Sequence, residues 1–321
     1  MIFLKKEQER DFVILNLTDP QLHDREWESG QIERDILMRT VTELVERVKP
    51  DLITISGDIS WAGDNKAYDA FADLMDSFQL PWAPVWGNHD NQGGPEFVES
   101  VARRYMAHKY CVYEKGDPAM GNGNYVICIV ENGRPIEGVI LMDSHDRHID
   151  EDGNNTYAKL STEQIDWYRR QVQELKSHGC EDTLLILHIP IYAYRQASAS
   201  AYSREIDLKD PTYEMFQRKD CWNHGYEDSI GVQLENVASC THEDGVLDEV
   251  IKLGSTKNII AGHDHINNWM INYKGVRLIY GLKTGAGCYW HPRLNGGTVF
   301  RVTANGIAEV YHEYVDAHEI E

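Results

Sequence analysis

The sequence predicts an α/β fold in which two sheets pack together and helices cover the outside. Short apolar runs indicate buried strands, and in the first part of the chain segments of helical length separate them. Buried strands that alternate with helices favour parallel pairing. The last part instead carries strand-like segments in close succession, which predicts a second, largely antiparallel sheet.

The amino-terminal part reads as strand and helix in turn. The 31–49 segment has apolar residues on one face and Pro50 as its stop, and Pro95 suits the first position of a later helix. The expected strands are Phe12–Leu17, Leu52–Ser56 and Pro84–Trp86, and the expected helices are Gln31–Lys49, Lys66–Phe78 and Pro95–Met106.

The rest of the chain continues the pattern less regularly. Ser161 and Gln164 match a capping box at the start of a helix, and Gly179 follows its end. Strands are expected at Tyr125–Val130, Val139–Met142, Thr183–Leu187 and Asn258–Ala261, helices at Ser161–Ser177 and Gly245–Leu253, and several strands with turns between them within Trp269–Val315.

The charge of the chain limits its partners. Asp and Glu number 52 against 31 Lys and Arg, which gives a formal net charge of −21. Such a surface repels phosphate backbones and anionic lipids, so we expect neither nucleic-acid nor membrane binding. The six cysteines are scattered and no signal peptide is evident, so we expect reduced thiols in a cytoplasmic protein, although a Cys221–Cys240 pair stays open.

Polar residues of metal-binding type follow strand after strand. In an open α/β sheet such residues meet at the carboxyl ends of the strands. Taken singly, each has an ordinary explanation as a turn residue, a helix cap or a core histidine; their joint occurrence after apolar strands predicts a metal site. The groups are Asp19, Gly57-Asp58, Gly87-Asn88-His89-Asp90, His188 and Gly262-His263-Asp264-His265.

In this order the motifs resemble those of the calcineurin-like metallophosphoesterase superfamily, which read D-x-H, G-D, G-N-H-D/E, H and G-H-x-H. The resemblance covers roughly residues 12–285. It implies a single domain over residues 1–321, a four-layer α/β/β/α sandwich of two packed mixed sheets, and a site for two divalent metal ions.

The resemblance also implies a role for each motif residue. Asp58 would bridge the two metals, and His89 would donate a proton to the leaving group while its acidic neighbour Asp90 positions it. The remaining ligands would be Asp19, Gln21 and His265 for the first metal and Asn88, His188 and His263 for the second.

The first motif departs from the superfamily pattern, because Gln21 stands where histidine is expected. In an extended segment, position 21 points to the same side as Asp19. A D-x-Q variant is similar to that of ADP-ribose/CDP-alcohol diphosphatases and favours Gln21, but whether Gln21 or His23 contacts the metal stays open. An amide oxygen is a harder ligand than imidazole, so Mn or Fe is favoured and Zn, Ni or Co is possible. His23 is then a substrate contact at the rim or a surface histidine.

The implied reaction is hydrolysis of a phosphoester by a hydroxide that bridges the metals. The expected substrate is a small phosphorylated molecule, either a phosphodiester or a nucleotide-type diphosphate. A small-molecule phosphomonoesterase and an inactive binding scaffold of the same fold are the alternatives. The segment GDISWAG lacks the GDxVDRG of protein serine/threonine phosphatases, and no iron-binding tyrosine is evident beside Asp58.

The irregular segment 192–240 lies between two metal-binding motifs and is expected to form a cap over the site. Arg195 in this segment could pair with a second phosphate or a carboxylate of the substrate. The candidate substrate contacts in this segment are Tyr192, Arg195 and His224.

Overall fold

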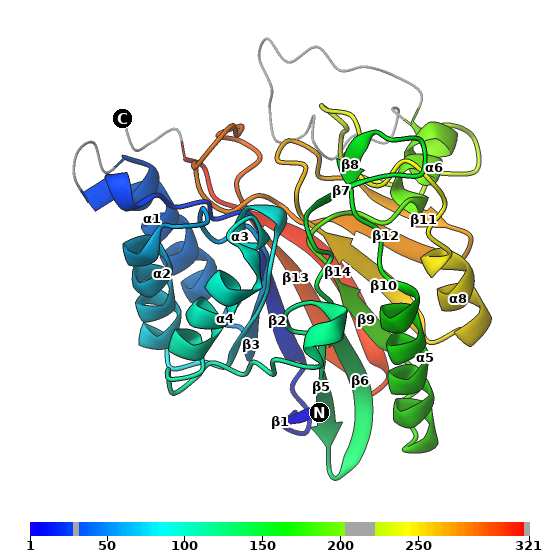
Figure 1. The fold of residues 1–321 in the computed structure, drawn as a ribbon. Helices are drawn as coiled ribbons and strands as arrows, with labels where there is room; N and C mark the ends of the chain where they lie inside the picture. The colour runs from blue at the N-terminus through cyan, green and yellow to red at the C-terminus, as the bar shows by residue number, and fades with distance from the viewer. Residues whose placement is uncertain (28–31, 203–221, 318–321) are drawn as a thin grey trace.

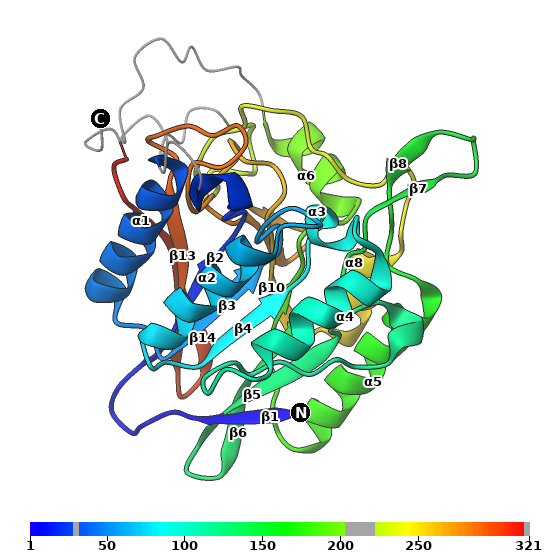
Figure 2. The same cartoon turned by 60° about the vertical axis from the view of Figure 1, so that its left-hand side comes forward.

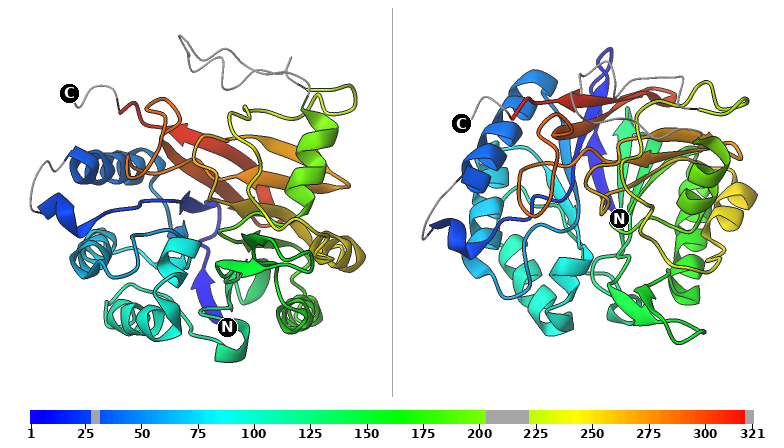
Figure 3. Two further views of the ribbon diagram at one scale, coloured as in Figure 1. Left: turned by 45° about the horizontal axis from the view of Figure 1, so that its top comes forward. Right: turned by 90° about the horizontal axis from the view of Figure 1, so that it is seen from above.

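The computed structural model describes residues 1–27, 32–202 and 222–317. Two sheets face each other between two layers of helices (Figures 1 and 3). The five-stranded sheet is covered by α1 (Ile32–Val48), α2 (Asn65–Ser77) and α4 (Gly94–Tyr105). The seven-stranded sheet is covered by α5 (Thr162–Ser177), α6 (Ala193–Ala201) and α8 (Val246–Leu253). The predicted sandwich of two packed mixed sheets is confirmed.

The strand order follows from the hydrogen-bonded ladders of the described residues. The larger sheet has the order β1-β5-β6-β9-β10-β12-β11, the smaller has β14-β13-β2-β3-β4, and β7 pairs with β8 in a separate hairpin. The strands are β1 (Ile2–Lys5), β2 (Phe12–Leu17), β3 (Leu52–Ser56), β4 (Trp82–Val85), β5 (Tyr125–Glu131), β6 (Arg134–Leu141), β7 (Arg147–Ile149), β8 (Asn155–Tyr157), β9 (Thr183–Ile186), β10 (Thr256–Ala261), β11 (Met270–Tyr273), β12 (Val276–Tyr280), β13 (Gly296–Thr303) and β14 (Gly306–Tyr314). Short helices are η1 (Asp24–Trp27), α3 (Asn88–Asn91) and η2 (Pro118–Met120).

The parallel strands of both sheets determine where the site forms. In the smaller sheet β2, β3 and β4 run parallel, and in the larger sheet β6, β9, β10 and β12 run parallel. The segments that follow these strands meet: Asp19 donates its backbone N–H to Gly57 (3.1 Å), and Gly262 donates to His188 (3.0 Å). Residues far apart in sequence are therefore gathered at one end of the sandwich.

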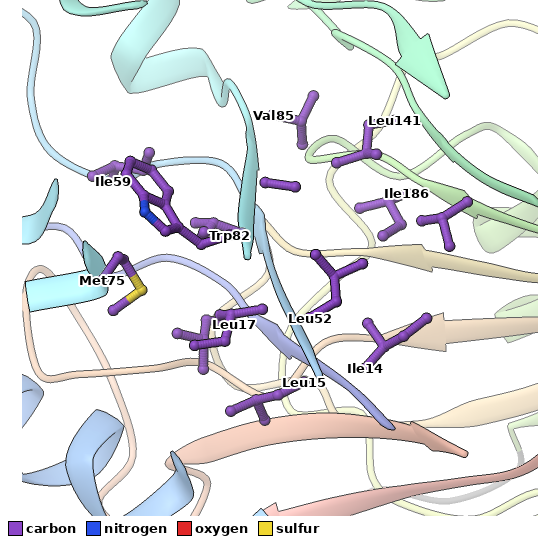
Figure 4. Close-up of a cluster of buried hydrophobic side chains, with 14 of the residues drawn as sticks. Ile14, Leu15, Leu17, Leu52, Ile59, Met75, Trp82, Val85, Leu141 and Ile186 are labelled. Carbon is purple, nitrogen blue, oxygen red and sulfur yellow. The ribbon is translucent and has the colours of Figure 1, made fainter. Parts of the chain in front are cut away.

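The core between the sheets explains why the strands are apolar on both faces. Ile14 of β2 and Leu52 of β3 lie with Ile186 of β9 on the side between the sheets, whereas Leu15 and Leu17 of β2 lie on the other face of their sheet; all five side chains are fully buried (Figure 4). These central strands have the other sheet on one face and helices on the other, so both of their faces exclude water. Burial of each such side chain stabilises the fold by roughly 2 kcal/mol.

The strand-rich tail differs from the expectation of a separate antiparallel sheet. Strands β11 and β12 extend the larger sheet, where β12 lies parallel to β10, whereas β13 and β14 extend the smaller sheet beside β2. The prediction failed because hydrophobic patterning identifies strands but not their partners. By contrast, the capping box of α5 is confirmed: the Ser161 hydroxyl accepts from the N–H of Gln164 (3.2 Å), and Gln164 Oε1 accepts from the N–H of Ser161 (2.9 Å).

A buried carboxyl group ties the two sheets together far from the strand ends described above. Glu137 of β6 is 1% exposed, and its Oε2 accepts a hydrogen bond from the backbone of Ile307 (3.1 Å) at the start of β14. Burial, with a smaller contribution from the charge of Asp182, raises the pKa of Glu137 to about 8. The folded protein therefore keeps this group protonated at neutral pH.

This shift predicts a loss of stability as the pH rises. Between pH 4.5, the ordinary pKa of the group, and about 8, the folded state holds a proton that the unfolded state has released. The free energy of unfolding should therefore fall by roughly 3–5 kcal/mol across this window, at about 1.4 kcal/mol per pH unit. Glu137→Gln keeps the acceptor but cannot ionise, so urea unfolding from pH 5 to 9 should show a flatter profile.

Two controls make this measurement specific. Glu181→Gln removes an exposed carboxyl group nearby in the chain and should leave the slope unchanged. Equal metal concentrations for all variants remove the pH dependence of metal binding from the comparison. A Glu137→Gln profile as steep as that of the wild type would refute the assignment.

The state of the cysteines and the presence of membrane-spanning helices can be assessed for the described residues only. Cys111, Cys128, Cys180, Cys240 and Cys288 are free thiols, whereas Cys221, the proposed partner of Cys240, lies outside the described residues. No helix within the described ranges is long and apolar enough to cross a bilayer.

Candidate metal centre

The backbone at the strand ends adopts an unusual conformation that brings the polar side chains inward. Asp19 (φ 53°), Asp58 (φ 51°) and His263 (φ 76°) all lie in the left-handed region, which non-glycine residues rarely occupy. Such strain persists where the surrounding structure enforces it, typically at functional sites. Glycine permits the close approach: a Cβ on Gly87 would clash with Asp58 Oδ1, and one on Gly262 would clash with Thr18.

The side chains predicted to hold the second metal converge. Ligand atoms of Asp58, His188 and His263 all lie within 4.8 Å of one another. His188 Nε2 is 3.2 Å from Asp58 Oδ2 and 3.1 Å from Asn88 Oδ1. His188 Nδ1 donates to the backbone oxygen of Ser56 (2.7 Å), which leaves Nε2 directed at the cluster.

Electrostatics in this cluster couple proton and metal binding. Burial opposes charge on His188, but the adjacent Asp58 carboxylate raises its pKa to about 10. Burial and the neighbouring charge of His188 lower the pKa of His263 to about 3. His263 is therefore neutral and ready to coordinate, whereas His188 must lose a proton, so a bound metal competes with that proton.

The side chains predicted to hold the first metal also meet. Asp19 Oδ1 lies 3.4 Å from His265 Nε2, and His265 Nδ1 donates to the backbone oxygen of Tyr289 (2.8 Å). Burial alone would raise the pKa of Asp19, but the contact with His265 and the charge of His188 lower it below its usual range. Asp19 is therefore a carboxylate, the form that binds a cation.

Unpartnered buried atoms show that these residues fit divalent metal ions. Asp19 Oδ1 and His263 Nε2 are both buried, and neither has a hydrogen-bond partner in the described part of the chain. A buried carboxylate oxygen and imidazole nitrogen without partners are costly unless a ligand occupies the space between them. The mixture of carboxylate, amide and imidazole donors suits Mn, Fe, Co or Zn.

Gln21 lies inside this site but is held by a lysine that the sequence did not reveal. Its Nε2 donates to Asp58 Oδ2 (3.3 Å), and its Oε1 accepts from Lys283 Nζ (2.9 Å), which also donates to the backbone oxygen of Asp19 (2.8 Å). The opposite amide orientation would set two donors against each other at Lys283. His23 instead bonds Asp64 (2.9 Å) and stacks on Trp61.

The buried ammonium group predicts a weakly held first metal. Lys283 is 1% exposed, so its charge is poorly screened and repels any cation bound to Asp19. Lys283→Met should remove this charge, release the Gln21 amide oxygen and tighten Mn²⁺ binding at the weaker site about tenfold, since about 1.4 kcal/mol is a modest repulsion at this depth. Titration with Mn²⁺, followed through the EPR signal of the free ion, measures the change.

Lys257→Met, on the surface of β10, serves as the control for net charge and should not change the titration. Unchanged or weaker Mn²⁺ binding in a folded Lys283→Met protein would show that the lysine supports the site instead of opposing the metal.

His89 lies at the site, but its orientation differs from the expectation. Its Nε2 is 3.9 Å from Asp58 Oδ2, while Nδ1 contacts Gln92 Oε1 (3.1 Å), and Gln92 in turn hydrogen-bonds Asp146. The carboxylate of Asp90 instead accepts hydrogen bonds from the N–H of Gly87 (2.7 Å) and the hydroxyl of Tyr68 (2.6 Å).

Asp90 is therefore a residue that holds the loops after β3 and β4, and the expectation that it orients the His89 ring is corrected. Its carboxylate also accepts from the backbone of Ile59 (3.2 Å). Amide and hydroxyl donors occupy both oxygens of Asp90, and the acidic groups near the His89 ring are Asp58, 3.9 Å from Nε2, and Asp146, which hydrogen-bonds Gln92.

A cavity of about 220 Å³ opens over the cluster. Beside the metal-type residues it is lined by side chains that the sequence analysis missed: Gln92, Arg147, Tyr157, Glu235, Cys288 and Tyr289. These residues come from loops and a short hairpin, which carry no periodic pattern. Lys283 had one usable signal, because it comes shortly after strand β12, as the other site residues follow their strands.

The proposed substrate contacts of the 192–240 segment lie elsewhere. The Arg195 guanidinium donates to the Ser239 hydroxyl (2.8 Å) and backbone (2.8 Å), and His224 contacts Glu227 (2.7 Å) at the surface. Tyr192 precedes α6, whose Tyr194 is buried against the larger sheet. Neither His23 nor these three residues line the cavity as described. Residues 203–221 of the proposed cap lie outside the described ranges.

Comparison with known proteins points to one family. The model for the family "Calcineurin-like phosphoesterase" matches residues 12–267. Similar curated proteins include "Probable inactive purple acid phosphatase 28" of Arabidopsis thaliana, 26% identical over 79% of this chain and 64% of that protein. "Phosphatase DCR2" of Saccharomyces cerevisiae is 24% identical over 82% and 44%, respectively. "Probable glycerophosphodiester phosphodiesterase GpdQ" of Arcobacter nitrofigilis is 27% identical over 44% and 42%. The chain spans less than two thirds of the length of each of these relatives.

Proposed function

Because this chain belongs to the calcineurin-like phosphoesterase family, we propose that it is a metal-dependent hydrolase of small phosphoesters, acting on phosphodiesters or nucleotide-type diphosphates. The observation that carries the proposal is the convergence of Asp58, Asn88, His188 and His263, with an unpartnered nitrogen on His263. The similarity to a protein named as a glycerophosphodiester phosphodiesterase supports the diesterase reaction.

The side chains that meet at this site are assigned as ligands of the proposed metal centre. Asp19 and His265 would hold the first ion, Asn88, His188 and His263 the second, and Asp58 would serve both. When bound, two divalent ions supply an activated water and neutralise charge on the phosphoryl oxygens. The residues themselves do the orienting: backbone oxygens of Ser56 and Tyr289 fix the imidazoles of His188 and His265.

Proton transfer to the leaving group is assigned to His89. With Nδ1 held by Gln92, the other ring nitrogen, Nε2, faces the cavity on the side of Asp58. The ring of Trp61 packs against it, with centroids 3.9 Å apart, and limits its rotation. Because Nδ1 donates its hydrogen to Gln92, the imidazolium form of His89 is the acid, and its Nε2–H would protonate an alkoxide as it departs.

An inactive binding scaffold is the second candidate, because a relative that matches 79% of this chain is named as probably inactive. The two candidates differ in turnover but not in fold. Protein purified without chelator should contain transition metal and should hydrolyse bis-p-nitrophenyl phosphate after reconstitution with Mn, Fe, Zn or Ni. EDTA-treated protein is the control. Stoichiometric metal without turnover of any phosphodiester, diphosphate or monoester would favour the scaffold.

A further inference from the structure

Arg147 stands at the wall of the cavity without a charged partner. It begins β7, directly opposite Tyr157 of β8, in the hairpin that projects from the body of the protein in Figure 2. The residue is exposed, and no oppositely charged side chain lies within 4.0 Å of its guanidinium among the described residues, although the chain carries a net charge of −21. It is also the single Lys or Arg among the described residues that line the cavity.

The tyrosine opposite fixes the direction of this guanidinium. Arg147 Nη2 donates to the hydroxyl of Tyr157 (2.9 Å), and the guanidinium lies over the phenol ring, 4.5 Å from its centroid. Within the described residues these contacts use one of its five N–H donors, and the carboxyl group that acts on its charge is that of its sequence neighbour Asp146. The remaining donors are available to an anion.

The same tyrosine connects Arg147 to the metal-type residues. The rings of Tyr157 and His263 pack edge to face, with centroids 4.3 Å apart, and both side chains line the cavity with Asp58 and Asn88. A ligand whose phosphoryl group sits at the Asp58 cluster therefore shares the cavity with the guanidinium of Arg147. Glu235 on the cavity wall is already bonded to the Tyr289 hydroxyl (2.7 Å) and to the N–H of Ile266 (2.8 Å).

We propose that Arg147 binds a second phosphate of the substrate and makes the site selective for diphosphates over compounds with one phosphate. A guanidinium suits this task because it can donate two parallel hydrogen bonds to one phosphate. This inference rests on the proposed function and assigns to Arg147 the contact that the sequence suggested for Arg195.

Binding of ADP and AMP tests the assignment, because the two probes differ by one phosphate. Calorimetric titrations at equal excess Mn²⁺ should show that the wild type prefers ADP, and that Arg147→Gln lowers the ratio of AMP to ADP dissociation constants about tenfold, as expected for a charge-assisted hydrogen-bonded pair. Arg147→Lys should restore part of the preference. Arg134→Gln, an exposed arginine at the start of β6, should keep it.

The outcomes separate this inference from the proposed function. An unchanged ratio in Arg147→Gln, or a wild type that binds AMP as tightly as ADP, would overturn the role of Arg147. Turnover of bis-p-nitrophenyl phosphate by the wild type is measured on the same preparation. Absence of turnover of this diester and of ADP and AMP, with the ADP preference intact, would overturn catalysis while leaving the binding site established.

Discussion

Asp58→Asn should reduce kcat/KM for bis-p-nitrophenyl phosphate by about 10³-fold, the loss expected when a central electrostatic group of an active site is neutralised. Asp58 is 1% exposed, its Oδ1 accepts from the N–H of His89 (2.9 Å), and its Oδ2 lies beside both His188 and Gln21. Asparagine keeps the shape of the side chain and can still accept the hydrogen bond from the N–H of His89. Its single amide oxygen cannot bind two cations, however, and its NH₂ group repels a cation. Metal content per chain, measured by mass spectrometry, should fall with the activity.

Asp64→Asn is the matched control, since Asp64 lies in the same loop after β3 and contacts His23 without lining the cavity. It should retain activity within about threefold, as surface substitutions usually do little. An Asp58→Asn protein that keeps two metals and more than a tenth of wild-type activity would remove Asp58 from the bridging position.

The sequence predicted those parts of the site that follow buried strands. Asp58, Asn88, His188 and His263 each come directly after an apolar run, and the parallel pairing of such runs brings their ends together. Carboxylate, amide and imidazole groups that meet at one place are typical ligands of a divalent transition metal, so these residue types predicted a metal site. The location of each followed from local pattern and one rule of sheet geometry, so no tertiary detail was needed.

The site residues that the sequence did not predict are positioned by tertiary contacts. Arg147 and Tyr157 belong to a short hairpin with no periodic signal, and Lys283 reaches Gln21 across 262 positions of sequence. Arg195 is predicted to contact the substrate because it lies between two metal-binding motifs in the sequence. In the structure its guanidinium instead donates to the backbone oxygen of Ser239. Tertiary packing determines which polar group a long side chain contacts, and local sequence patterns do not reveal that contact.

His89→Ala should lower kcat by roughly 10²–10³-fold for esters with alkoxide leaving groups, within the range of general acid catalysis. The same change should matter far less for p-nitrophenyl esters, because p-nitrophenolate departs without a proton. The physical reason is the placement of Nε2 at the cavity, opposite the nitrogen that Gln92 holds. Parallel assays with an alkyl and a p-nitrophenyl phosphodiester, both at saturating Mn²⁺, give the ratio that reports the acid.

Gln92→Ala provides an intermediate control, because it removes the Nδ1 partner and leaves the acid in place. It should lower kcat for the alkyl ester less than His89→Ala does and leave metal content unchanged. If His89→Ala slowed both esters equally, the histidine would be binding the transferred phosphoryl group, since a proton donor affects only the substrate whose leaving group needs the proton. Wild-type rates on both esters would leave His89 with no chemical role, and the donor would then have to be water at the mouth of the cavity.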